Sequence, residues 1–434
     1  MSPELTGFAG LMVFFVLVAL RLPIGFALTI VGYVGSCYLT SMRAGEAILG
    51  SSPISTAASY TLSVIPLFVL MSELALAGGL TKEMYKAVHN WLGNLRGGLC
   101  FASIAACAGF AAICGSSIAT AVTIGKVALP EMKKLNYEDR IATGTIAAGG
   151  TLGIMIPPSL SFVLYGVITE QSIGKLFIAG ILPGILLASL FILTIFILLW
   201  RDPSRAPATG SAVSWSEKLK SALRSWAAGV LFLVVIGGIW VGFFTPTEAA
   251  AVGCFLAFVF GMIQKRLTRE GIIQAFRNTA RTTGMMFILV IGAMVFNYFM
   301  ALSLLPMVMA DWVKGLALSR YAILAVIFII YLILGCLMDT LSMIVLTLPV
   351  IFPVVMALGF DPIWFGVLMT LLAEAALITP PVGMNVFVVA GISEGVPMET
   401  VFRGIFPFFS AMIICLVILV LFPQISLFLP GFMR

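Results

Sequence analysis

Apolar runs of about 20 residues recur along the whole of this 434-residue chain, and they limit its fold more than any other feature. Hydrophobic residues make up 61% of the sequence and charged residues only 10%, whereas an average soluble protein has about 25% charged residues. A helix crosses a bilayer with about 20 apolar residues, and a barrel strand would alternate over about ten. The runs show no such alternation, so the sequence predicts an all-α polytopic membrane protein.

The first apolar run, residues 8–20, has no basic segment before it and no small-residue cleavage site after it. We therefore expect it to be a membrane span rather than a removable signal. The seven cysteines show no CxxC spacing and indicate packing rather than a structural metal site. The chain has one histidine, isolated carboxylates and no GxxxxGK[ST] motif. We expect no catalytic residues, and neither an enzyme nor an ATP-driven pump.

The chain repeats its proline landmarks at a spacing of 223 residues. The pair Pro157-Pro158, in "IMIPPSLSF", returns as Pro380-Pro381 in "LITPPVGMNVF". The other matches are Pro130 with Pro353 and Pro23 with Pro246. Matches at one spacing indicate a duplicated chain, so we looked for equivalent segments in its two halves.

The apolar runs divide the chain into two predicted repeats joined by a linker. The first repeat, residues 1–200, has scaffold spans within 5–78, a re-entrant hairpin at 97–134, a broken helix at 137–170 and a span at 181–200. Residues 201–226 form a cytoplasmic linker. The second repeat, residues 227–434, has scaffold spans within 228–305, a hairpin at 322–357, a broken helix at 363–394 and a span at 404–422. Five crossings are an odd number, so the repeats are predicted to be inverted.

Loop charges agree with this topology. Lysine and arginine gather in residues 79–96, 201–226 and 264–281, and the loops predicted on the opposite face are nearly neutral. Because cytoplasmic loops carry the excess of positive charge, these three segments are predicted to be cytoplasmic. Both termini are then periplasmic.

The double prolines are predicted to interrupt helices at membrane depth. Each pair removes the helical hydrogen-bond donors for two carbonyls, those of Gly153 and Ile154 or those of Ala376 and Leu377. Non-helical backbone at that depth is tolerated where it lines a cavity or bonds to protein. Broken helices in inverted repeats typically direct carbonyls to Na⁺ and helix N-termini to anionic substrates. The alternative is a pair of packing kinks satisfied by neighbouring hydroxyls.

Three acidic residues need separate interpretation. Asp339, at a hairpin tip, is either a functional charge or the N-cap of the second hairpin arm. Glu374, one turn before the second break, is either a cavity residue or a satisfied polar contact. Glu248 follows Thr245 and Pro246 in the pattern of a capping box, which predicts a structural role.

Five segments make the chain resemble the large membrane subunit of the tripartite ATP-independent periplasmic (TRAP) transporters. The similarity covers essentially the whole chain. The segments are "RLPIGFAL" (21–28), "GSSIATAV" (115–122), "GGTLGIMIPPSLSFVLYG" (149–166), "FTPTEAAAVG" (244–253) and "TPPVGMNVFV" (379–388).

This resemblance implies an elevator-type fold of the ion-transporter superfamily in the bacterial inner membrane. It implies Na⁺-coupled import of a small organic anion, such as a dicarboxylate, a sugar acid or a similar carboxylate. The partners implied are a periplasmic substrate-binding protein and a small four-helix membrane subunit. We expect that subunit to be a separate chain, because this chain begins close to its first span.

The resemblance also implies two Na⁺ sites between hairpin tips and broken helices. The residues implied for the first site are Ser116, Ser117, Gly153, Ile156 and Pro158. Those for the second are Asp339, Thr340, Ala376, Thr379 and Pro381. Those near the substrate are Ser117, Ser159, Asp339, Thr340, Gly383 and Asn385.

With almost no arginine or lysine expected at membrane depth, substrate carboxylates are predicted to bind helix N-termini near Ser117 and Ser159, hydroxyls and bound Na⁺. A standalone Na⁺ symporter for divalent anions would share the inverted hairpins and need no binding protein. That carrier is the alternative function.

Overall fold

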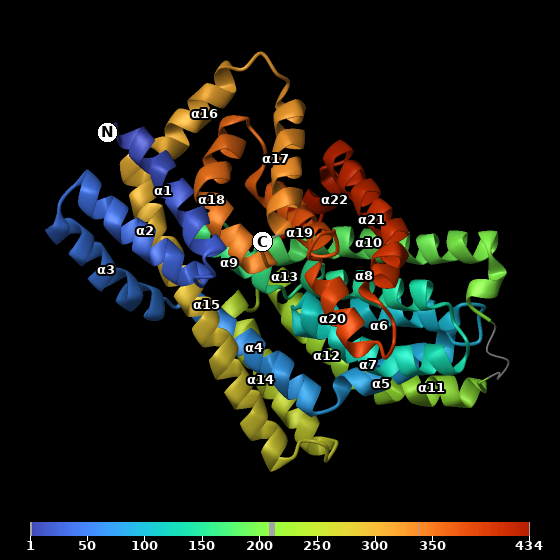
Figure 1. Cartoon of the computed structure of the whole chain (residues 1–434). Coiled ribbons are helices and arrows are strands. Elements are labelled where there is room, and N and C mark those ends of the chain that lie inside the picture. The colour runs from blue at the N-terminus through green and yellow to red at the C-terminus, as the bar shows by residue number, and fades with distance from the viewer. Residues whose placement is uncertain (1, 208–212, 337, 434) are drawn as a thin grey trace.

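The computed structural model describes residues 2–207, 213–336 and 338–433, and every element in those ranges is helical (Figure 1). Five of the described helices are long and apolar enough to cross a membrane, or up to eight if each bent pair of helices is one span. The prediction of an all-α protein with several membrane spans is therefore confirmed.

A scaffold group is built around one long helix, α15. Its members are α1 (Pro3–Ala19), α2 (Ile24–Leu39), α3 (Met42–Ala57), α4 (Val64–Ala77), α14 (Pro246–Ile263) and α15 (Arg269–Ser303). The helices α1, α2 and α3 lie along the C-terminal part of α15, α4 lies along its N-terminal part, and α14 packs on α4 (Figure 1). Glycines allow close packing, because a Cβ at Gly25 would lie 2.8 Å from the Ile288 carbonyl oxygen.

A hairpin group holds both double prolines. Its first half contains α6 (Gly98–Cys114), α7 (Ser117–Lys134), α8 (Asp139–Met155), α9 (Leu160–Ile168) and α10 (Ile173–Arg201). Its second half contains α17 (Arg320–Gly335), α18 (Thr340–Ala357), α19 (Pro362–Ala376), α20 (Met384–Ile392) and α21 (Met398–Leu421). The helices α8 and α9 meet at 41°. The start of α7 at Ser117 and of α18 at Thr340 repeats the spacing of 223 residues, and the opposite orientation of the halves stays a prediction.

Two helices form the centre of the hairpin group. Every residue of α8 from 141 to 155 and of α19 from 363 to 376 is buried. Gly144 of α8 packs against the backbone of Gly404 in α21, at a distance that leaves no room for a side chain. The two interrupted helices are therefore held in protein, with α6, α7 and α21 around α8.

Several predicted loops are helices. The predicted cytoplasmic loop 264–281 is part of α15, which begins at Arg269 after Thr268 accepts a cap hydrogen bond from Gly271 N at 3.0 Å. The other helices outside predicted spans are α3, α5 (Leu80–Leu92), α11 (Trp215–Arg224) and α16 (Leu305–Gly315). Their mixed polar and apolar sequences fall below the hydropathy of a span, which is why a search for apolar runs misses them.

Short helices complete the described chain. They are α12 (Trp226–Phe232), α13 (Gly238–Trp240) and α22 (Gln424–Leu427). At the start of α14, Thr245 and Glu248 form the predicted capping box. Glu248 accepts from Thr245 N at 2.8 Å, and Thr245 accepts from Glu248 N at 3.3 Å. The structural interpretation of Glu248 is confirmed.

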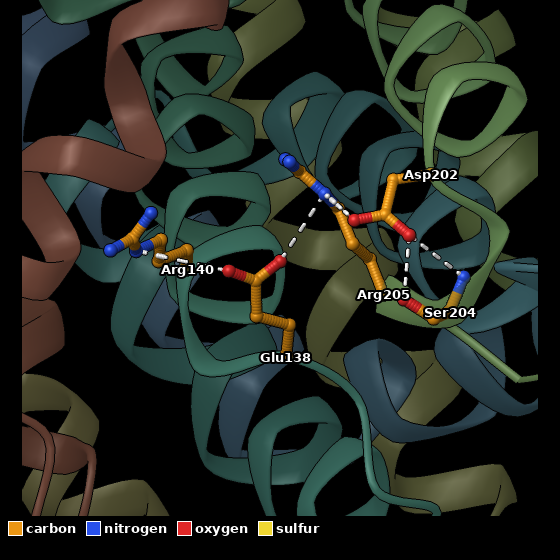
Figure 2. Close-up of polar contacts among 5 residues, drawn as sticks. All are labelled: Glu138, Arg140, Asp202, Ser204 and Arg205. Atoms are coloured by element: carbon orange, nitrogen blue, oxygen red, sulfur yellow. Dashed lines mark hydrogen bonds and ion pairs between the residues drawn. The ribbon is translucent and has the colours of Figure 1, made fainter.

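An ion cluster joins the end of α10 to the start of α8 (Figure 2). Arg205 Nε lies 3.1 Å from Asp202 Oδ2 and 3.5 Å from Glu138 Oε2, and Arg140 lies 3.8 Å from the other Glu138 oxygen. Asp202 also accepts from the Ser204 hydroxyl at 2.6 Å. This hydrogen bond, followed by that of Arg205, lowers the pKa of the Asp202 carboxyl.

Candidate functional site

The tips of the two hairpins meet at one buried carboxyl group, that of Glu374 in α19. Glu374 is 0% exposed and accepts hydrogen bonds from the hydroxyls of Ser117 and Thr340, the second at 3.3 Å. Ser117 is the first residue of α7, and Thr340 is the first residue of α18. Because a helix N-terminus carries partial positive charge, the acidic side chain sits where two such ends converge. Of the two interpretations from sequence, the satisfied polar contact is confirmed.

The first hairpin tip touches the first broken helix directly. A Cβ at Gly153 would lie 2.5 Å from the Ser116 carbonyl oxygen. Gly115 has a φ of +63°, and a Cβ there would lie 2.7 Å from the Pro158 carbonyl oxygen. Ser116, Gly153 and Pro158, three residues implied for the first Na⁺ site, therefore lie together. Ser117 lies beside them, although its hydroxyl is directed to Glu374.

The side chain of the fifth residue of that set, Ile156, points away from the hairpin tip. The Ile156 side chain packs on α10, where a Cβ at Gly184 would lie 2.6 Å from Ile156 Cγ1. The Ser116 carbonyl oxygen already accepts from Thr120 N at 3.1 Å and from the Thr120 hydroxyl at 2.8 Å. A Na⁺ ion at this oxygen would share it with Thr120.

The carbonyl oxygens at the two breaks differ in their hydrogen bonding. In the described part of the chain no hydrogen bond reaches the carbonyl oxygens of Gly153 and Ile154, as the prolines predict. In the second break Ala376 O accepts from Thr379 N and Leu377 O accepts from Asn385 N, each at 3.1 Å. The expectation of bare carbonyls at Ala376 and Leu377 is therefore wrong. The longer break, residues 377–383, folds back as a turn and supplies new donors.

The second hairpin also touches its broken helix. Gly335, at the end of α17, contacts Ala376 so closely that a side chain would overlap it. The Cys336 thiol donates to Pro380 O at 3.1 Å, and the Thr379 hydroxyl bonds back to Ala375 O at 2.6 Å. Both double-proline peptide bonds are cis. Ala376 and Pro380 thus lie at the second hairpin, whereas Pro381 is exposed.

Asp339 caps α18 and also lines a cavity. One carboxylate oxygen accepts from Ser342 N at 3.2 Å, which confirms the N-cap interpretation. Asp339 and Ser342 form one wall of a cavity of about 730 Å³, and the scaffold residues Arg21 and Arg281 line it too. Sequence reasoning missed both arginines, because it placed Arg281 in a cytoplasmic loop. The N-cap residue Thr268, followed by Glu270 in the first turn, was the available signal.

A second group of buried polar atoms has no partner among the described residues. Both amide atoms of Asn385, which is 0% exposed, lack a hydrogen bond, and so do the hydroxyls of Ser159 and Ser161. A Cβ at Gly150 would lie 3.3 Å from Asn385 Nδ2 and 3.1 Å from Ser117 O, so Asn385 lies near the first hairpin tip. Gly383, the N-cap of α20, lies two residues before Asn385 and has a φ of +55°. Buried polar atoms are almost always paired, so these atoms are available to a ligand or to water.

No cluster of three or more metal-binding side chains occurs in the ranges that the structure describes. The groups that the two breaks themselves offer to a cation are main-chain and hydroxyl oxygens. These are hard ligands that suit a small monovalent cation at a broken helix.

The fold is similar to that of a solved structure. It matches the crystal structure of the Alcanivorax borkumensis YdaH transporter with a TM-score of 0.65 at 15% sequence identity, covering 89% of this chain and 88% of that one. At this identity the likeness concerns the fold alone.

Sequence comparison supplies the family. Residues 11–425 match the family model described as tripartite ATP-independent periplasmic transporter, DctM component. The chain is 36% identical over 379 residues to the C4-dicarboxylate TRAP transporter large permease protein DctM of Pseudomonas aeruginosa, covering 87% of this chain and 88% of that protein. It is 32% identical over 411 residues to the sialic acid TRAP transporter large permease protein SiaM of Vibrio cholerae, covering 94% and 95%.

The chain belongs to the DctM component family, the large permease subunits of TRAP transporters. It is thus a multi-pass membrane transport protein and not an enzyme. The family works with a periplasmic binding protein and a small membrane subunit.

Proposed function

We propose that this permease imports a small organic anion together with Na⁺, and that the hairpin group carries both across the membrane past the scaffold group. The observation that carries the proposal is the junction at Glu374, where both hairpin tips and a broken helix meet inside the protein. A junction of that kind allows both hairpins to move as one body.

The co-transported Na⁺ ions would bind beside the two breaks. The support for the first site is the free carbonyls of Gly153 and Ile154 next to the Ser116 main chain. For the second site it is the carboxylate of Asp339, the hydroxyls of Thr340 and Thr379, and the main chain at Ala376 and Pro381. A carbonyl oxygen has a second lone pair, so Ala376 O accepts from Thr379 N and still has one to offer.

The anion would bind between the hairpin tips. The N-termini of α7 and α18 point at this region, and the unpaired amide of Asn385 and hydroxyl of Ser159 offer donors. The relatives are named for a C4-dicarboxylate and for sialic acid, and both cargoes are carboxylates. We therefore propose a carboxylate of this size range as the cargo.

The partners and topology complete the proposal. A periplasmic binding protein would deliver the acid, a separate four-helix subunit would support the scaffold group, and both termini would lie in the periplasm of a bacterial inner membrane. If uptake proceeds at full rate without any binding protein, the standalone symporter alternative replaces this part.

Transport by reconstituted vesicles tests the proposal. The permease, its small subunit and its binding protein are assayed for uptake of radiolabelled succinate and N-acetylneuraminate under an inward Na⁺ or K⁺ gradient. We expect uptake of one acid with Na⁺ only. Ser116→Leu and Thr340→Leu should abolish it, because a large side chain fills the tip. Ser410→Leu, on an exposed face of α21, is the matched control. Equal uptake in both gradients rejects Na⁺ coupling, and full uptake by the two tip variants rejects the site.

A further inference from the structure

We propose that Arg21 and Arg281 of the scaffold group form a carboxylate-binding site, which receives the transported anion opposite the second hairpin tip. This inference rests on the proposed function and adds a cationic half of the pathway that the hairpins and broken helices lack.

The cavity is the first observation. It is a half-open space of about 730 Å³ between the turn joining α1 to α2, the middle of α15 and the tip of the second hairpin. Two positive side chains, Arg21 and Arg281, and one negative side chain, Asp339, line it. Its remaining wall is largely apolar, including Leu22 and Met285. An apolar cavity with a few convergent charged groups is typical of a small-molecule site.

The position of the two arginines along the scaffold helices is the second observation. The 35 residues of α15 run parallel to α2, where Gly25 meets Ile288 and Gly32 meets Phe296. Nearer its N-terminus α15 meets α4, where Asn278 donates to Glu73 at 2.9 Å. Arg281 and the Arg21 turn lie where contacts with α4 give way to contacts with α2. That position is the middle of the scaffold group, away from either end of α15.

Neither guanidinium has an ion pair among the described residues, although each shares the cavity with Asp339. A charged side chain within a membrane domain is costly unless it faces a water-filled cavity or a partner. Both arginines are exposed on this face, so water or an anion can reach them.

The backbone at Arg21 is the third, independent observation. Arg21 has a φ of +67°, and its N–H bonds to Val18 O at 2.8 Å while Leu22 N bonds to Leu17 O at 3.1 Å. This is the Schellman arrangement that ends a helix, in which glycine normally occupies the left-handed position. The chain thus holds an arginine side chain in a backbone conformation that most residues avoid.

Carboxylates fit these groups best. A guanidinium pairs with a carboxylate through two parallel hydrogen bonds, and two arginines give the cavity a net positive charge even with Asp339 ionised. Asp339 belongs to the moving hairpin and the arginines belong to the scaffold. The site is therefore completed only when the second hairpin tip stands at the level of Arg281, as it does here.

Arginine labelling in wild-type vesicles tests the site without any variant that must fold. Phenylglyoxal, which modifies water-accessible arginine, is added to vesicles holding the permease and its small subunit, and each peptide is quantified by mass spectrometry. We expect Arg21 and Arg281 to react, and succinate, N-acetylneuraminate or gluconate to slow both at least fivefold. Arg277, exposed one turn earlier on α15 and outside the cavity, should react at the same rate with and without acid.

Two results overturn the inference: no reaction at Arg21 and Arg281, or reaction that no acid slows. Na⁺-driven uptake measured in parallel with the binding protein keeps the proposals separate. Na⁺-driven uptake without protection of the two arginines supports the proposed function and rejects the arginine site. Protection of both arginines without Na⁺-driven uptake supports the arginine site and rejects the proposed function. In transporting vesicles Arg281→Gln should raise KM at least tenfold, Arg281→Lys should raise it less, and Arg277→Gln should leave it unchanged.

Discussion

Glu374 accepts a hydrogen bond from the Ser117 hydroxyl, which lies 257 residues earlier in the chain at the tip of the other repeat's hairpin. The second oxygen of the same carboxyl group accepts from Thr340. One buried side chain thus joins α7, α18 and α19. It links the two halves, in addition to the contact of each hairpin with its own broken helix.

Replacing Glu374 by glutamine should therefore separate the hairpin tips. The amide keeps one acceptor oxygen and turns the other position into a donor that faces a hydroxyl. A buried polar group that loses its hydrogen-bond partner costs about 1–3 kcal/mol, so uptake should fall roughly tenfold. Initial uptake rates in vesicles measure this. Glu399→Gln, which removes the acceptor of an exposed pair with Arg403 on α21, is the control and should keep the wild-type rate. An unchanged rate in Glu374→Gln would show that the junction is not needed for transport.

Replacing Gly153 by alanine should force the first broken helix away from the hairpin tip. The added Cβ would lie 2.5 Å from both the Ser116 carbonyl oxygen and the Thr120 hydroxyl, too close for either atom. Overpacking of this kind costs about 1–3 kcal/mol, and here it falls on the first proposed Na⁺ site. We expect the apparent affinity for Na⁺ to drop at least tenfold in uptake titrations.

The matched control for that prediction is Gly391→Ala. Gly391 lies inside α20, and a Cβ there meets no atom within 4 Å. Alanine is about 1 kcal/mol more favourable than glycine in a helix interior, so this variant should melt slightly higher and transport normally. A Na⁺ titration that is identical for Gly153→Ala and Gly391→Ala contradicts the proposed cation position.

The sequence predicted the parts of this fold whose signals are local. Apolar runs, the double prolines and their recurrence placed both hairpins and both broken helices, and the pattern at Thr245 placed a helix start. The amphipathic helices α5 and α11 were missed because their lysines and serines resemble a charged loop in a search for spans. Their apolar faces are recognised only when a 3.6-residue period is tested.

The candidate site was harder to predict, because its key contacts join distant segments. Nothing local to Glu374 identifies Ser117 as its donor, and nothing local to Arg281 places it beside Asp339. The new partners of the Ala376 and Leu377 carbonyls depend on how residues 377–383 fold back, which a proline pair does not specify. The types of residue at the two breaks could therefore be predicted from the sequence, but the contacts and hydrogen bonds between these residues could not.

Arg205 should make the docking of the linker sensitive to acid and to salt. Its guanidinium and the Ser204 hydroxyl lower the pKa of Asp202, so the stabilisation is present above the ordinary carboxyl pKa and is lost as pH falls through the lowered value. In Arg205→Gln the drop in melting temperature between neutral pH and pH of about 3 should be smaller than in wild type. Salt screens exposed pairs, so about 1 M salt should remove most of the difference. Identical acid profiles for the two proteins would count against the ion cluster.

Replacing Asn385 by leucine should lower transport without lowering the stability of the protein. The buried amide has no partner among the described residues, and an unpaired polar group of this kind costs about 1–3 kcal/mol. Leucine has the same number of side-chain heavy atoms and no polar atoms, so the variant should melt at the same temperature as wild type or higher. Uptake should nevertheless fall at least tenfold, because the amide is proposed to bind the cargo. Asn278→Leu provides the contrast: it breaks the hydrogen bond to Glu73, so it should melt lower. A lower melting temperature for Asn385→Leu, with uptake unchanged, would mean that Asn385 holds the fold and does not contact the anion.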